Sequence, residues 1–153
     1  MGETIGIVLL WLFVINLGIA VGAGFYEARV VVPVWAQSPP QSLGSPESGL
    51  RFWAFVTTGP LTLLTLANLV AAWLAPEPAR TWWLVAVVIT ITERMATLGY
   101  FVPTMIRLGR DQSGPGGGAA ATFARWRTRN VVRNFASLVA WIAALRALTL
   151  AGG

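Results

Sequence analysis

Cysteine, histidine and lysine are all absent from the 153 residues of this chain. Without cysteine and histidine, the chain cannot form disulfide bonds, use thiolates, or employ histidine as a catalyst or as a ligand of a metal or haem. Charged residues are also scarce, at 11% against about 25% in an ordinary soluble domain. Chemistry in this protein must therefore depend on Glu, Asp, Arg, Tyr, Asn, Ser or Thr, and we expect no metal ion and no organic cofactor.

Hydrophobic residues, in contrast, make up 56% of the chain and gather into four long apolar runs. The runs cover about residues 4–32, 50–75, 81–106 and 125–149, and loops at 37–49, 76–80 and 109–121 separate them. A helix needs about 20 apolar residues to cross the hydrocarbon core of a bilayer, so each run is long enough. We predict a single transmembrane domain over residues 1–153, an all-α four-helix bundle, integral to the membrane, with up-down-up-down topology.

Proline and glycine suggest where these helices end, bend or pack. The first helix is expected to end near Val32, because Pro33 disfavours the helical conformation of the residue before it. Gly59 and Pro60 predict a kink in the second helix. Gly18 and Gly22 are four residues apart, a spacing that lets another helix approach closely; we expect packing within the bundle, with a homodimer contact as the alternative.

The distribution of positive charge predicts the orientation in the membrane. All 11 basic residues are arginines, and several lie in the loop at 109–121 or on its flanks, namely Arg107, Arg110, Arg125, Arg127 and Arg129. Arginine-rich loops stay in the cytoplasm, so we expect the loops at 37–49 and 109–121 there and both termini outside, in a bacterial inner membrane. These arginines can bind anionic lipid headgroups, and because no recognition motif accompanies them we expect no nucleic-acid binding.

The third apolar run carries the adjacent charges Glu93 and Arg94 near its middle. A helix rises about 1.5 Å per residue, so Glu93 would lie roughly 16 Å beyond Trp82, near the centre of the hydrocarbon core. Charged side chains are costly at this depth and are functional candidates by default. Thr97, Tyr100 and Thr104 follow Glu93 at spacings of four, three and four residues, which places them on one face of a helix.

The other three runs also carry polar residues. The alternating topology places most of them in the cytoplasmic half of the membrane, the half next to the two long loops. They predict an internal cavity in which a carboxylate acts as a general base or acid, an arginine stabilises an oxyanion, and Tyr100 or Asn134 orients the substrate. The catalytic candidates are Glu93, Glu27, Arg133 and Tyr100, and the substrate-binding candidates are Asn134, Asn130, Arg129, Arg94, Thr58, Asn16 and Tyr26. The expected partners are a lipophilic small molecule and the membrane lipids.

A structural interpretation of the same charges stays open at this point. Ion pairs between them would fix the rotation of the helices without any catalytic role. Glu93 would then pair with Arg133 or Arg94, and Glu27 would pair with Arg129 or Arg29. Under this interpretation the protein is a non-catalytic membrane protein, either an assembly partner or a binder of lipophiles.

Three stretches of the chain form a recognisable pattern. They are Gly24-Phe25-Tyr26-Glu27-Ala28-Arg29-Val30-Val31-Val32-Pro33-Val34-Trp35, then Val102-Pro103-Thr104-Met105-Ile106-Arg107-Leu108, and the Arg-Asn start of the last run. With these stretches and its four spans, the chain resembles the anthrone oxygenase-like family of small membrane proteins. Many members of that family have an asparagine where this chain has Met105.

The resemblance implies an activity as well as a fold. Characterised relatives oxidise anthrone-type aromatic polyketides with molecular oxygen and without evident metal or flavin. Such a reaction needs a base that makes the carbanion or phenolate of the substrate. Glu93 or Glu27 as this base, with Arg133 holding the anion, would fit the requirement. An acid–base isomerase or hydrolase of a lipophilic substrate is the enzymatic alternative. An ion or proton carrier is less favoured, because the runs contain no internal repeat and no pair of interrupted helices.

Overall fold

The computed structural model describes residues 2–37, 52–110 and 118–152. These residues form long helical segments over Thr4–Trp35, Trp53–Leu74, Ala79–Arg110 and Ala119–Ala151, with no strand in the described ranges. All 4 are long and apolar enough to cross a membrane. The protein is therefore an integral membrane protein, and the predicted all-α four-helix bundle is confirmed.

Each long segment except the last is divided by a change of helix type. The first contains α1 (Gly2–Tyr26), η1 (Glu27–Val31) and α2 (Val32–Trp35); the second contains η2 (Trp53–Thr58) and α5 (Gly59–Leu74). The third contains α6 (Ala79–Ala96), η3 (Thr97–Phe101) and α7 (Val102–Arg110), and the fourth is α8 (Ala119–Ala151). The three η segments are π-helices, whose turns are wider than those of an α-helix.

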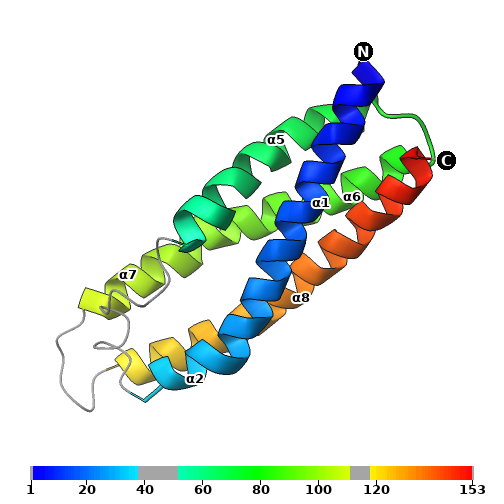
Figure 1. Ribbon diagram of the computed structural model, residues 1–153. Coiled ribbons are helices and arrows are strands. Elements are labelled where there is room, and N and C mark those ends of the chain that lie inside the picture. Colours follow the sequence, from blue (N-terminus) through cyan, green and yellow to red (C-terminus); the bar gives the residue numbers. More distant parts are fainter. Residues whose placement is uncertain (1, 38–51, 111–117, 153) are drawn as a thin grey trace.

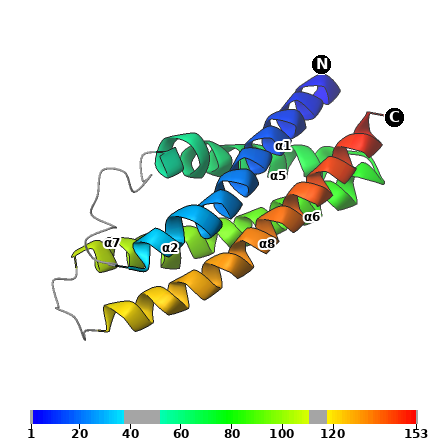
Figure 2. The ribbon, with the colours of Figure 1, turned by 60° about the horizontal axis from the view of Figure 1, so that its bottom comes forward.

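The helices form a bundle in which each packs against two neighbours. α1 contacts α5 and α8, and α6 contacts the same two helices. Consecutive long helices run in opposite directions, so α1 begins and α8 ends at the same end of the bundle (Figure 1). A second view shows α1 and α8 side by side along the bundle (Figure 2). This arrangement is compatible with the predicted up-down-up-down topology.

Several predicted helix ends were wrong. The first helix continues through Pro33 to Trp35, and Val32 keeps helical angles of φ −59° and ψ −38°. The third helix extends to Arg110, and the fourth begins at Ala119, because Ala119 and the two alanines after it are strong helix formers. The predicted start at residue 50 and the loop positions 38–49 and 111–117 lie outside the described residues.

The wide π-helical turns explain how the helices pass their prolines. In the first three long helices a proline follows two residues after a π-helix, with Pro33 after η1, Pro60 after η2 and Pro103 after η3. Proline has no N–H to donate, and its ring clashes with the carbonyl group four residues earlier. A wider turn gives that carbonyl room. The helices therefore continue through these prolines, each of which follows a widened turn.

The bundle is held together mainly by apolar packing, and Asn68 adds a buried polar anchor. Its larger core cluster includes Leu10, Phe13, Leu17, Leu61, Trp83, Val87 and Ala144. Beside it, Asn68 donates through Nδ2 to the carbonyl oxygens of Leu9 (3.1 Å) and Leu64 (2.8 Å). Asn68 Oδ1 accepts a hydrogen bond of 3.0 Å from Trp83 Nε1. This anchor ties α1, α5 and α6 together and fixes their rotation.

Glycines of α1 differ in how closely α8 approaches them. Gly18 packs against the Trp141 indole, so it serves packing within the bundle, whereas Gly22 has open space around the position of a Cβ atom. The closest approach is at Gly24, where a Cβ atom would lie 2.9 Å from Asn134 Oδ1. The carbonyl oxygen of Gly24 accepts a hydrogen bond of 2.9 Å from Asn134 Nδ2.

Gly24→Ala is therefore expected to lower the free energy of unfolding by about 1–3 kcal/mol, the range typical of an overpacked contact. The added methyl group must displace the Asn134 amide and weaken its bond to the Gly24 carbonyl. Thermal unfolding in detergent would measure the change. Gly22→Ala is the matched control and should leave stability unchanged or slightly raised, because alanine favours helix more than glycine does. Equal melting temperatures for the two variants would contradict this account of Gly24.

Candidate functional site

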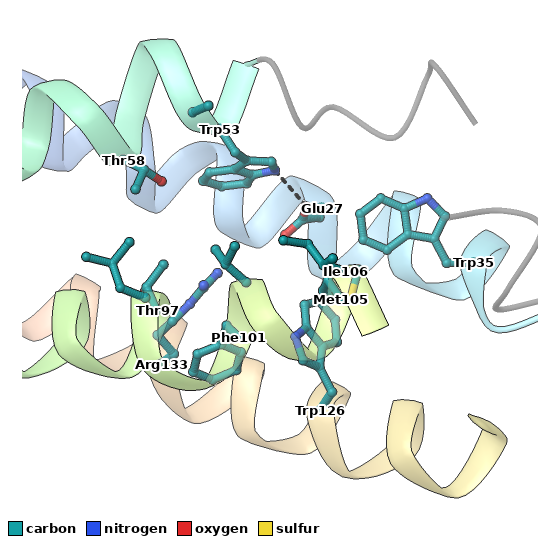
Figure 3. Close-up of a pocket in the computed structure, with 13 residues that line it drawn as sticks. Glu27, Trp35, Trp53, Thr58, Thr97, Phe101, Met105, Ile106, Trp126 and Arg133 are labelled. Carbon is teal, nitrogen blue, oxygen red and sulfur yellow. Dashed lines mark hydrogen bonds between the residues drawn. The ribbon is translucent and has the colours of Figure 1, made fainter. Parts of the chain in front are cut away.

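A cavity of about 350 Å³ lies where the three π-helical segments meet α8 (Figure 3). Its aromatic walls are Trp35, Trp53, Phe101 and Trp126, and its polar lining residues are Glu27, Thr58, Thr97 and Arg133. Small aliphatic side chains and Met105 complete the lining. The size is that of a small-molecule site, and an apolar lining with a few polar groups is typical of one.

Among the described residues, Glu27 supplies the only carboxylate of this lining. It lies on η1 and is 7% exposed. Its Oε1 accepts a hydrogen bond of 2.7 Å from Trp53 Nε1. No other hydrogen bond to this carboxylate occurs within the described residues, and Figure 3 shows the group directed into the cavity. The indole holds the carboxylate in place while leaving acceptor capacity for a ligand.

Arg133 enters the cavity from α8, on the side opposite η1 (Figure 3). Its guanidinium carbon lies 4.7 Å from the centroid of the Phe101 ring, a distance suited to a cation–π contact. The buried Nε atom has no hydrogen-bond partner in the part of the chain that the structure describes. Among the described residues no carboxylate lies within 4.0 Å of this guanidinium, although Glu27 and Glu93 act on it by charge from farther away. Arg133 therefore has donors left for an anionic ligand.

Glu93 does not line the cavity. It pairs with its chain neighbour, with Arg94 Nη2 2.9 Å from Glu93 Oε1, and both residues are buried. This is one of the two partners that the structural interpretation gave to Glu93. Glu93 Oε2 and Arg94 Nε are buried without hydrogen-bond partners among residues 2–37, 52–110 and 118–152. Glu27 is buried as well, and Arg133 is half-buried, so two acidic and two basic side chains lie largely inside the bundle.

The structure separates the remaining sequence candidates. Thr58 lines the cavity with Glu27 and Arg133, but the others do not. Tyr26 is 63% exposed on the outer surface of α1. Tyr100 lies beneath Arg129, whose guanidinium carbon is 4.6 Å from its ring centroid. Because η3 contains wider turns than an α-helix, Phe101 and not Tyr100 faces the cavity.

Two of the predicted substrate-binding asparagines bond the backbone of a neighbouring helix. Asn16 donates 3.2 Å to the carbonyl oxygen of Val56. In a regular α-helix that carbonyl would accept from residue 60, which is a proline without an N–H. Asn134 bonds the Gly24 carbonyl, as described above. Asn130 lies elsewhere, in a separate groove between η1 and α8.

Sequence reasoning missed most of the cavity wall. Trp53, Phe101, Trp126 and Thr97 were not among the predicted site residues, and Trp35 suits a membrane-interface anchor equally well. The sequence did contain one signal for these residues, a proline in each of the first three long helices. In the structure each of these prolines lies two residues after a π-helix that supplies cavity residues.

The described residues contain no group of three or more acidic side chains that could hold a metal ion. No model of a protein family, no characterised protein and no solved structure matches this chain.

Proposed function

We propose that this protein is a membrane-embedded enzyme that removes a proton from a flat, lipophilic aromatic substrate. The observation that carries the proposal is that Glu27 and Arg133, which form no ion pair with each other, line one aromatic-walled cavity. A substrate between them would lose a proton to Glu27 and leave its negative charge near Arg133. A general base contributes typically 10²–10⁴-fold to a rate.

The position of the cavity favours a substrate that arrives through the membrane. Three of its lining residues, Leu98, Val102 and Ile106, are also exposed on the outside of the bundle, at 53%, 40% and 47%. These side chains mark an opening toward the surrounding hydrocarbon. Inside, the indoles and the Phe101 ring offer aromatic faces on which a planar ring system can stack.

The resemblance to the anthrone oxygenase-like family supports oxygenation as the reaction. Glu27 would take a proton from the activated ring CH₂ group, and Arg133 would hold the resulting enolate oxygen. Molecular oxygen would add to the carbanion carbon and give a hydroperoxide once a proton returns. Loss of water then converts the hydroperoxide to a ketone, so that CH₂ and O₂ become C=O and H₂O. Of the two bases considered for this reaction, Glu27 is the one that fits, because Glu93 does not line the cavity.

The charge distribution supports an orientation for this enzyme. Arg107, Arg110, Arg125 and Arg127 lie at the end of the bundle where α7 ends and α8 begins, and all are exposed. By the positive-inside rule this end faces the cytoplasm of a bacterial inner membrane, with both termini outside. The cavity, which lies near the same end, would then receive its substrate from the inner leaflet.

The proposal is tested with 1,8-dihydroxyanthrone and the purified protein in lipid nanodiscs. We expect quenching of tryptophan fluorescence on binding, because Trp35, Trp53 and Trp126 line the cavity. We also expect conversion to the anthraquinone with equimolar uptake of dioxygen, at least about 100-fold faster than in protein-free nanodiscs. Binding without conversion would identify a lipophile binder and contradict the enzymatic proposal. Proton exchange at the CH₂ group without oxygen uptake would favour the isomerase.

A further inference from the structure

A polar groove lies between η1 and α8 and is distinct from the aromatic-walled cavity. Its volume is about 400 Å³, and none of its lining residues also lines the cavity. Arg29 and Arg127 provide its charge, Asn130 and Asn134 its buried polar groups, and Phe25 and Val131 part of its apolar wall. We propose that this groove binds the headgroup of an anionic phospholipid, with the phosphate between the two arginines.

The arginines of the groove are available to an anion. Both side chains are exposed, and within the described residues no carboxylate lies within 4.0 Å of either guanidinium. Arg29 comes from η1 and Arg127 from the first part of α8, so a phosphate between them would contact two helices at once. Guanidinium groups bind phosphate oxygens in a bidentate manner, which favours such a bridging position.

The buried floor of the groove suggests which headgroup it prefers. Asn130 lines the groove and is 1% exposed, and its Oδ1 atom has no hydrogen-bond partner among the described residues. A buried acceptor without a partner costs free energy that a hydroxyl donor from a ligand would recover. A headgroup with free hydroxyls, such as that of phosphatidylglycerol, offers both a phosphate for the arginines and a hydroxyl for Asn130.

The outside of α8 provides a path for the acyl chain of the same lipid. Val131, Val132 and Phe135 are exposed at 42%, 67% and 55%, and they continue from the groove toward the membrane interior. Phe135 makes an edge-to-face contact with Phe25 of the groove wall, with ring centroids 5.7 Å apart. The groove therefore combines a charged end with an apolar strip, as binding of a single phospholipid requires. This inference does not depend on the enzymatic proposal.

Native mass spectrometry of detergent-solubilised protein titrated with phosphatidylglycerol or phosphatidylcholine tests the proposal. We expect one phosphatidylglycerol to bind selectively, and the double substitution Arg29→Gln with Arg127→Gln to weaken its binding about 30-fold, from the loss of two basic contacts. The control, Arg80→Gln with Arg146→Gln, removes the same charge elsewhere in the bundle, outside the groove, and should keep wild-type affinity. Equal weakening in both double variants would overturn the site in favour of general surface charge.

Two further measurements separate the possible ligands. Asn130→Leu should reduce the preference for phosphatidylglycerol over phosphatidic acid, which lacks the headgroup hydroxyls, and an unchanged preference would remove Asn130 from the site. Excess inorganic phosphate should not displace the lipid, because phosphate alone gains nothing from the apolar strip. Full displacement by inorganic phosphate would show a free-phosphate site instead and would overturn the lipid assignment.

Discussion

Glu27→Gln is expected to lower the rate of 1,8-dihydroxyanthrone oxidation about 100- to 10 000-fold, the range of a lost general base. The amide has nearly the shape of the carboxylate, and its oxygen can still accept the hydrogen bond from Trp53 Nε1. The cavity should therefore keep its geometry and its affinity for the ligand while losing the group that takes the proton. Oxygen uptake measures the rate, and tryptophan quenching measures binding.

The control for this substitution is Glu77→Gln, which makes the same change at an exposed residue in the turn between α5 and α6. It should retain the wild-type rate. A wild-type rate in Glu27→Gln would exclude Glu27 as the base. A lower melting temperature with an unchanged rate per folded molecule would instead assign Glu27 a structural role in holding Trp53.

Arg94→Met is expected to lower the free energy of unfolding by about 3–5 kcal/mol, the usual effect of removing one partner of a buried ion pair. Arg94 Nη2 lies 2.9 Å from Glu93 Oε1, and the two side chains are only 10% and 5% exposed. Without Arg94, the Glu93 carboxylate loses its only hydrogen bond among the described residues. Thermal unfolding in detergent or nanodiscs measures the loss.

Two comparisons make this prediction specific. The double variant Glu93→Gln with Arg94→Met removes both charges and should recover much of the stability, because no buried charge is left without its partner. At the exposed pair of Glu77 and Arg80, 3.3 Å apart with side chains 55% and 47% exposed, Arg80→Met should cost less than about 1 kcal/mol. Similar losses for Arg94→Met and Arg80→Met would contradict a special role of the buried pair. A large loss of turnover in Glu93→Gln without loss of stability would return Glu93 to the mechanism.

The fold could be predicted because its signal is local and repeated. Long apolar runs with few charges identify membrane-crossing helices whatever their neighbours are. The same local signal predicted the helix ends less well, since it treated Pro33 as a stop. Backbone geometry overrode that preference: the π-helix η1 accommodates the proline and the helix continues to Trp35.

The candidate site could be predicted only in part, because its composition depends on which side chains meet. The expected depth of each residue in the membrane and the helical spacing predicted Glu27, Thr58 and Arg133, which do share one cavity. The same reasoning ranked Glu93 equally, yet its neighbour Arg94 pairs with it outside the cavity lining. Local propensities say nothing about such competition between partners.

By itself, then, the sequence determined that this protein lies in a membrane, how many times it crosses the membrane, and which residue types are available for chemistry. All three follow from composition and from the length of the hydrophobic runs. Only the tertiary structure decided the rotation of each helix and therefore which polar residues face inward. The wider turns of η3 bring Phe101 into the cavity and leave Tyr100 beneath Arg129. Residue spacing does not reveal a rotation of the helix by a fraction of a turn, but this rotation decides which side chain faces the cavity.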